Sequence, residues 1–113
     1  MNNILELTLL YDFYGELLTK KQKTLFELYY LNDFSLNEIA EDAGVSRQAV
    51  SDLLIRVKKK LYIYEKKLGL VKSHSQLKQE LSDIREALGK ETFGKGSSNE
   101  NISSMIDKVI NKL

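Results

Sequence analysis

The sequence contains no cysteine and no proline, and His74 is its one histidine. Without cysteine, the chain can form no disulfide, zinc–thiolate site or iron–sulfur cluster, and it has no cysteine nucleophile. A single histidine cannot supply a multi-histidine metal site. A cysteine-free composition fits a reducing compartment, although it also fits a secreted protein, and we expect the protein to be cytoplasmic.

The sequence also lacks long apolar runs and a dominant charge. No stretch of about 18 apolar residues occurs, so we expect no segment that spans a membrane. The 17 Lys and Arg residues oppose 16 Asp and Glu residues, which gives a net charge of +1 and excludes a uniformly basic protein. Any polyanion site must therefore be local. No P-loop, dinucleotide or metal motif occurs, so we expect no cofactor, no catalytic residues and no enzyme.

The lack of proline, together with abundant Leu, Lys and Glu, predicts an all-α fold. We expect a helix-turn-helix domain with an N-terminal helix over residues 1–70 and a C-terminal helical extension over 71–113. In that extension, a helix is predicted over 73–88 and a mobile, Gly- and Ser-rich loop over about 89–101. An apolar stripe over 102–113 predicts a last helix, which packs either on its own chain or on a second copy.

The first 34 residues predict two helices. Residues 3–18 carry apolar side chains on more than one helical face, so this helix should be buried on several sides or pair with another chain. Gly15 indicates close packing or an early end of that helix. Thr19 and Gln22 form a capping box for the next helix. Its inward residues should be Leu25, Phe26, Leu28, Tyr29 and Leu31, before an end at Asn32 and Asp33.

Residues 35–61 predict a helix-turn-helix. Ser35 and Glu38 form a second capping box, which opens a short helix. Gly44 lies where a helix end needs a positive φ, and Val45 should be buried directly after it. A scaffolding helical hairpin, without any role in binding, is the alternative interpretation.

The second helix of this motif is predicted from Arg47 to about Leu68, with Ser46 as its N-cap. Its inward stripe is Val50, Leu53, Leu54, Val57, Leu61, Tyr64 and Leu68. Residues 45–68 hold seven basic and two acidic side chains, a net charge of +5, whereas residues 1–18 and 35–44 each have a net charge of −3. The pattern indicates a basic helix on an acidic body, although a solvated helix face would look the same.

The motifs in residues 18–61 resemble the DNA-reading C-terminal domain of bacterial sigma factors. The resemblance lies in the Leu-Thr-x-x-Gln opening, the Ser-Leu-x-Glu-Ile-Ala entry and the Ser-Arg-x-x-Val…Arg-x-x-x-x-Leu helix. Over its whole length the chain resembles the YlxM family of small helix-turn-helix proteins. Leu-Leu-Tyr-Asp-Phe-Tyr-Gly-Glu-Leu-Leu-Thr at 9–19, followed by Lys21 and Gln22, carries that resemblance. It implies a link to the signal recognition particle.

The resemblance to sigma factors implies base-reading positions at Arg47, Gln48, Ser51 and Asp52, and backbone contacts at Lys21 and Ser35. Glutamine can read adenine and arginine can read guanine or phosphate. Ser46, Arg56, Lys58, Lys59 and Lys60 complete the predicted nucleic-acid-binding set. Asp52 differs from the other residues of this set, because its carboxylate repels the phosphates of a nucleic acid.

Two functions follow as expectations. The first is a homodimeric regulatory protein that reads duplex DNA, with structured RNA as a further polyanion of the same kind. The second, which the YlxM resemblance implies, is an accessory of the signal recognition particle that contacts its RNA or its GTPase.

Overall fold

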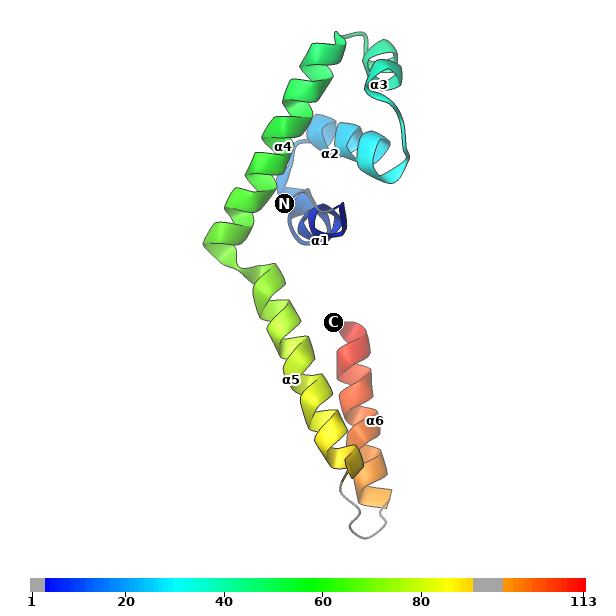
Figure 1. Ribbon diagram of the computed structural model, residues 1–113, viewed down its shortest axis with the longest axis vertical. Helices are drawn as coiled ribbons and strands as arrows, with labels where there is room; N and C mark the ends of the chain where they lie inside the picture. Colours follow the sequence, from blue (N-terminus) through cyan, green and yellow to red (C-terminus); the bar gives the residue numbers. More distant parts are fainter. Residues whose placement is uncertain (1–3, 91–96) are drawn as a thin grey trace. The chain divides into compact units, whose positions relative to one another are not determined.

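The computed structural model describes residues 4–90 and 97–113, and these residues form helices and no strands (Figure 1). The elements in chain order are α1 (Ile4–Tyr14), the 3-10 helix η1 (Gly15–Leu17), α2 (Lys20–Phe26), the π-helix η2 (Glu27–Leu31), α3 (Leu36–Ala43), α4 (Arg47–Leu68), α5 (Leu70–Lys90) and α6 (Ser97–Lys112). The predicted all-α fold is confirmed. None of the described helices has the length and apolar character needed to cross a membrane.

The chain divides into two compact units, Met1–Val71 and Lys72–Leu113, which we call the N-terminal unit and the C-terminal unit. Helices α1 to α4 belong to the N-terminal unit. The first two residues of α5, Leu70 and Val71, belong to it as well. The rest of α5 and α6 form the C-terminal unit.

Helix α4 organises the N-terminal unit, because it supplies residues to both of its apolar clusters. Figure 1 shows α2 and α3 along α4, and α1 also packs against it. The first cluster joins α1 and α2 to α4 through Leu7, Leu10, Tyr11, Tyr14, Leu18, Phe26, Val57 and Leu61. The second joins α2 and α3 to α4 through Leu25, Ile39, Ala40, Val50 and Leu54. One helix therefore fixes the position of all the others in this unit.

Helix α1 is buried along one face, formed by Leu7, Leu10, Tyr11 and Tyr14, which corrects the expectation of burial on several sides: Leu5 and Leu9 are 73% and 43% exposed. Tyr11 and Tyr14 are both buried, and the ring of Tyr11 stacks on Phe26 with 4.4 Å between the ring centroids. A Cβ atom at Gly15 would lie 3.1 Å from the Tyr11 ring, so the chain packs closely at this glycine. The α-helix also ends there, because η1 begins at Gly15. Both expectations for Gly15 are confirmed.

The second helix begins as predicted and ends differently. The Thr19–Gln22 capping box is present in both directions. Leu31, predicted to face inward, is 48% exposed. The reason is the π-helix η2, in which the amide of Asn32 donates to the carbonyl of Glu27 over 2.9 Å. The wider turn shifts the helical register and carries Leu31 away from the core.

The turn between α3 and α4 confirms the predicted conformation and corrects one side chain. The Ser35–Glu38 capping box opens α3, and Gly44 ends it with φ +69°. Val45, predicted to be buried, is 37% exposed. Its amide donates to the carbonyl of Ala40 over 3.1 Å, so Val45 closes the turn through its backbone while its side chain faces outward.

Helix α4 has the predicted N-cap and most of the predicted inward stripe. Ser46 accepts a hydrogen bond from the amide of Ala49, and Gly69 ends the helix with φ +61°. Leu68, predicted to face inward, is 55% exposed, because Leu61 is the last residue of α4 to enter a core cluster.

The start of α5 corrects the helix predicted over 73–88, because α5 begins at Leu70. The hydroxyl of Tyr14 accepts a hydrogen bond from the Leu70 amide over 3.0 Å. A carboxylate oxygen of Glu65 accepts one from the Val71 amide, also over 3.0 Å. These two side chains satisfy amide groups that a helix start leaves without partners, so the helix begins three residues earlier.

The C-terminal unit also corrects the ends of the loop predicted over 89–101. Gly89 and Lys90 lie in α5, and residues from Ser97 onward lie in α6; residues 91–96 of the predicted loop lie outside the described residues. A glycine within a helix lowers helix stability by about 1 kcal/mol relative to alanine but does not prevent the helix, and serine is a favoured residue at helix N-termini. Arg85 and Asp107 form an ion pair between α5 and α6.

Candidate nucleic-acid interface

The N-terminal end of α4 presents the predicted base-reading residues to solvent. Arg47, Gln48 and Asp52 are exposed and Ser51 is half-buried. The buried residues Val50 and Leu54 hold the opposite face of this stretch in the core. Because Ser46 uses its hydroxyl to accept from the Ala49 amide over 3.1 Å, the first turn is fixed before any ligand binds.

Gln48 and Asp52 are joined by a hydrogen bond across one turn of α4. The amide Nε2 of Gln48 donates to Oδ1 of Asp52 over 2.9 Å. A glutamine amide has two N–H groups and a carbonyl oxygen, so one donor and the acceptor of Gln48 remain available. Adenine is read by one donor and one acceptor together, which is what remains. The bond therefore orients Gln48 and also occupies part of the Asp52 carboxylate.

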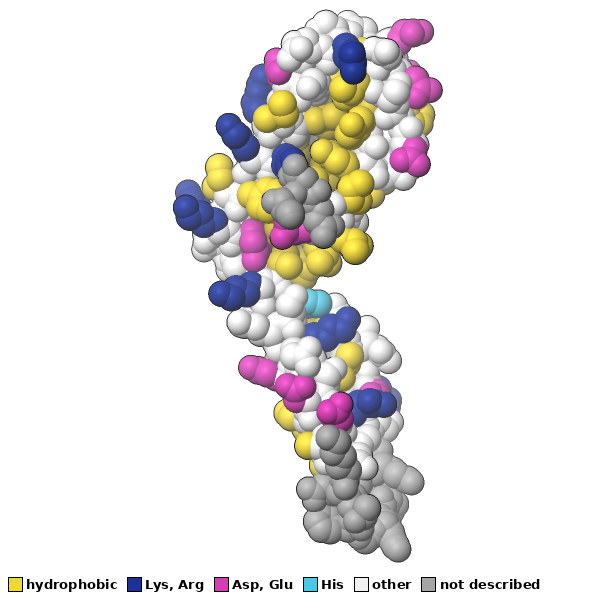
Figure 2. Space-filling model, in the orientation of Figure 1, with side chains coloured by type: hydrophobic (Ala, Val, Ile, Leu, Met, Phe, Trp, Pro, Cys, Tyr) yellow, Lys and Arg dark blue, Asp and Glu magenta, His cyan; other side chains and the backbone are white. Residues whose placement is uncertain are grey.

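The predicted phosphate-binding cations follow farther along α4. Arg56 and Lys59 are exposed, whereas Lys58 and Lys60 are half-buried. Figure 2 shows dark-blue basic side chains alternating with yellow apolar ones along this helix. The stretch is thus a mixed surface rather than a continuous positive strip.

Two predicted backbone contacts lie on other helices of the same unit. Lys21 is exposed in the first turn of α2, and Ser35 is the exposed N-cap of α3. The Ser35 hydroxyl accepts from the Glu38 amide over 3.0 Å, and the Ser35 side chain also stabilises the Glu38 carboxylate. Since α2 and α3 both pack on α4, these residues belong to the same compact unit as the α4 set.

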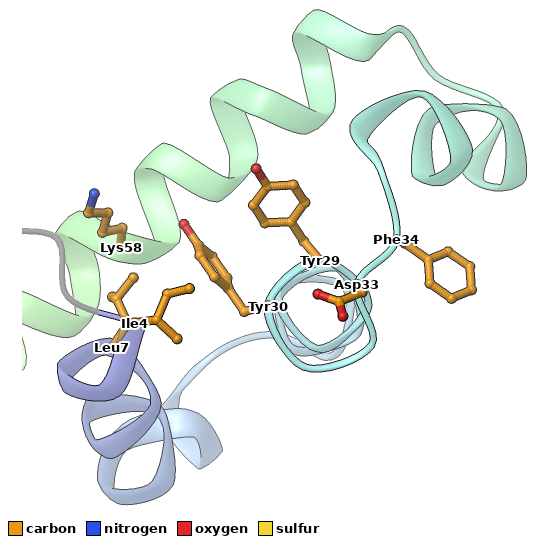
Figure 3. Close-up of a pocket in the computed structure, with 7 residues that line it drawn as sticks. All are labelled: Ile4, Leu7, Tyr29, Tyr30, Asp33, Phe34 and Lys58. Atoms are coloured by element: carbon orange, nitrogen blue, oxygen red, sulfur yellow. The ribbon is translucent and has the colours of Figure 1, made fainter.

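Lys58 has surroundings that sequence reasoning missed. It lines a cavity of about 390 Å³ together with Ile4, Leu7, Tyr29, Tyr30, Asp33 and Phe34. Figure 3 shows Tyr29 and Tyr30 pointing from η2 toward α4, while Phe34 points away. The two tyrosine rings meet edge to face with 4.9 Å between their centroids. No periodic pattern indicates this cavity, because the π-helix that turns the two rings toward α4 has no sequence signature.

Three tyrosine–glutamate hydrogen bonds tie the helices of this unit together, and sequence reasoning missed all of them. Tyr11 donates to Glu27, Tyr14 to Glu65 and Tyr62 to Glu6. The partners are 16, 51 and 56 residues apart, so helical spacing gives no signal for them. They fix α1 against η2, which follows α2, and against α4, which carries most of the candidate site.

These hydrogen bonds also change the acidity of the tyrosines. The bond to Glu6, together with partial burial, raises the pKa of Tyr62 to about 12. Burial, followed by the bond to Glu27, raises the pKa of Tyr11, and burial with the bond to Glu65 raises the pKa of Tyr14. At the N-terminus of α3, the backbone amide of Ser35 stabilises the carboxylate of Glu38 and lowers its pKa.

The described part of the chain brings no three histidine or acidic side chains together in a way that could hold a metal ion. His74, half-buried in α5, contacts the backbone carbonyl oxygen of Leu113.

Two capped helices joined by a left-handed glycine, with the start of the second helix facing solvent, define a helix-turn-helix protein. The chain belongs to the UPF0122 family, whose description is "Putative helix-turn-helix protein, YlxM / p13 like" and whose profile matches residues 1–102. The resemblance to the YlxM family is thereby confirmed. Membership in this family suggests DNA binding.

Named relatives carry the same family name. A UPF0122 protein of Caldanaerobacter subterraneus subsp. tengcongensis is 52% identical over 77% of this chain and 74% of its own length. A UPF0122 protein of Listeria welshimeri is 47% identical over 77% of this chain and 79% of its own. One of Symbiobacterium thermophilum is 47% identical over 78% of this chain and 82% of its own.

Proposed function

We propose that the protein is a non-enzymatic, cytoplasmic regulatory protein that binds duplex DNA as a homodimer through its helix-turn-helix. The observation that carries this proposal is the exposed N-terminal end of α4, at the start of a segment, residues 45–68, with a net charge of +5. A helix N-terminus favours phosphate oxygens, and an exposed helix of this kind fits the major groove of DNA.

In this proposal the start of α4 enters the major groove in the manner of sigma factors. Arg47 and Gln48 contact base edges, and Ser51 and Asp52 lie beside them. Phosphates are held on both sides of the groove by Lys21, Ser35, Ser46, Arg56, Lys58, Lys59 and Lys60. These contacts position the helix, whereas the base contacts give sequence specificity.

A second copy is part of the proposal because one copy offers few contacts. Two recognition helices related by a two-fold axis double the number of phosphate and base contacts without a new type of site. Symmetric half-sites in the DNA would then match the symmetry of the protein.

The test is DNA binding across a salt series, with a triple variant Lys58→Ala, Lys59→Ala and Lys60→Ala. Each phosphate contact adds roughly 0.9 to the salt slope on duplex DNA, so the variant should lower the slope by up to about 3. The matched control replaces Lys78, Lys108 and Lys112, three exposed lysines of the C-terminal unit, and should leave the slope unchanged. Salt-independent binding by the unmodified protein, or equal losses in both variants, would contradict the proposal.

A second candidate function is an accessory role in the signal recognition particle, through contacts with its RNA or its GTPase. The exposed carboxylate of Asp52 favours it, because a carboxylate repels phosphate and can accept only from cytosine, which weakens base reading of duplex DNA. Duplex RNA is read mainly by shape and backbone. A pull-down comparing the particle's RNA, its GTPase and random duplex DNA separates the two functions, since equal retention of all three would support neither.

A further inference from the structure

The middle of α4 carries a basic and apolar surface, of which the proposed DNA contacts use Lys58 and Lys59 but none of the apolar side chains. A shallow groove of about 650 Å³ is lined by Ile55, Lys58, Lys59, Tyr62 and Ile63. Ile55 is 52% exposed and Ile63 is 50% exposed, although isoleucine is among the residue types most often buried. Lys66 continues the same face one turn later and is also exposed. We call this surface the α4 groove.

Helix α1 carries a surface of the opposite charge. Leu5 and Leu9 are 73% and 43% exposed, and Asp12 is exposed on the same face, because spacings of four and three residues align on a helix. Residues 1–18 contain three acidic and no basic side chains. We call Leu5, Leu9 and Asp12 the α1 stripe.

The α1 stripe and the α4 groove complement each other in two respects. Both offer large apolar side chains at helical spacing, and one surface is acidic where the other is basic. They are also neighbours within the N-terminal unit: Lys58 lines the α4 groove and also lines the cavity that contains Ile4 of α1. Two adjacent, complementary surfaces on one molecule can both be used at once across a two-fold axis.

We propose that a second copy of this chain occupies the α4 groove, with the α1 stripe of each copy seated in the α4 groove of the other. Leu5 and Leu9 cover the exposed isoleucines, and Asp12 approaches Lys59 or Lys66. This inference rests on the proposed function only because the proposed function requires a homodimer. The inference adds which surfaces form the dimer.

The proposed interface leaves the base-reading end of α4 accessible. Gln48 and Ile63 are separated along the helix by roughly 22 Å at 1.5 Å per residue. Ile55, at the near end of the groove, lies roughly 10 Å from Gln48 along the helix, so the contact covers the groove without reaching Gln48. Lys66, which is outside the proposed phosphate-binding set, allows the charge contact to be tested without changing that set.

The absence of cysteine from the chain makes a direct test possible. Two single variants, Leu9→Cys and Ile63→Cys, are prepared as full chains, one carrying a size tag, then mixed and oxidised. A disulfide needs Cβ atoms within about 4.5 Å, so it forms efficiently only across the proposed contact. The matched control pairs Leu9→Cys with Ile84→Cys, which is also 50% exposed but lies in the C-terminal unit.

We expect the Leu9/Ile63 mixture to yield the mixed disulfide-linked dimer, and the Leu9/Ile84 mixture to yield little. Equal cross-linking in both mixtures would overturn the proposal. So would a dimer that persists in Leu9→Ser and Ile63→Ser variants but is lost in Ile84→Ser, because the C-terminal unit would then form the interface.

A charge exchange gives an independent readout by sedimentation equilibrium. Asp12→Lys should weaken dimerisation on the order of tenfold, and adding Lys66→Asp should restore most of the loss. No restoration would count against the contact. DNA binding is measured separately on the unmodified chain. Cross-linking of the Leu9/Ile63 mixture without DNA binding by the unmodified chain refutes the proposed function alone, and DNA binding by the unmodified chain without the cross-link refutes the interface alone.

Discussion

The two units of the chain differ most in how they bury apolar side chains. The N-terminal unit holds thirteen buried hydrophobic residues, whereas none of the described side chains of the C-terminal unit is buried. Leu77, Ile84 and Met105 of the C-terminal unit are 46%, 50% and 63% exposed. The first unit has a core that holds its surface in place, and the second has apolar stripes without such a core.

This difference explains why the candidate site can be read from local signals. Arg47 and Gln48 point outward because Val50 and Leu54, on the other face of the same helix, are fixed in the core. The difference can also be measured separately in each unit. All six tyrosines lie before residue 72, so tyrosine fluorescence reports on the N-terminal unit, whereas helical ellipticity reports on both.

The largest expected effect is that of removing a central side chain from the better packed unit. Phe26 has no exposed surface and contacts the rings of Tyr11 and Tyr30. Phe26→Ala should lower the free energy of unfolding by about 3–5 kcal/mol. Urea unfolding followed by tyrosine fluorescence measures this. A loss below about 1 kcal/mol would mean that the N-terminal unit is no better packed than its neighbour.

The same glycine-to-alanine substitution should have opposite effects on stability in the two units. Gly44 has φ +69°, so Gly44→Ala should cost about 1–2 kcal/mol by forcing alanine into a left-handed conformation. Gly89 lies in α5 without a positive φ, and a Cβ atom there would meet nothing within 4 Å. Gly89→Ala should therefore not destabilise, and should gain up to about 1 kcal/mol. Thermal unfolding of both variants by ellipticity tests the opposite signs.

Alkaline pH should destabilise the N-terminal unit specifically, because the C-terminal unit has no tyrosine. The folded-state pKa of Tyr62 is raised from 10.0 to about 12, so the folded state keeps a proton that the unfolded chain releases. This contribution is fully present below pH 10 and is lost between pH 10 and 12. Tyr62→Phe should flatten the decrease in stability over that window, by on the order of 1 kcal/mol or less.

The control for the alkaline prediction is Glu6→Gln, which removes the charge of the accepting carboxylate. It should flatten the same window to a similar extent. If the loss of stability between pH 10 and 12 is unchanged in both variants, it arises from other tyrosines of this unit.

The smallest effect is expected for an apolar truncation in the C-terminal unit. Ile84 is already 50% exposed, so Ile84→Ala removes little buried surface and should change the tyrosine-detected unfolding free energy by less than about 0.5 kcal/mol. The same urea titration as for Phe26→Ala applies. A loss as large as that of Phe26→Ala would show that the two units unfold as one.

The sequence predicts those features that short-range chemistry determines. Thr19 with Gln22 and Ser35 with Glu38 start helices where capping geometry requires, and Gly44 and Gly69 have the positive φ that ends them. Each signal depends on residues within one helical turn. The N-cap of α4 and the exposure of its first turn are also determined by residues within one helical turn.

Features determined by distant parts of the chain were not predicted. The exposure of Val45 and Leu68 depends on where the core ends, and the outward rotation of Leu31 depends on the π-helix. The hydrogen bond between Tyr62 and Glu6 joins residues 56 positions apart. The role of each cation as a phosphate contact depends on a ligand and remains a prediction.

The joint hydrogen-bonding role of Tyr14 and Glu65 at the start of α5 has a consequence for amide hydrogen exchange. Their hydroxyl and carboxylate hold the Leu70 and Val71 amides, and Val71 packs against the first core cluster. These two amides should therefore exchange with deuterium only when the whole N-terminal unit opens. The amides of α5 beyond Val71 belong to the C-terminal unit and should exchange through local fraying, so protection should fall within a single helix.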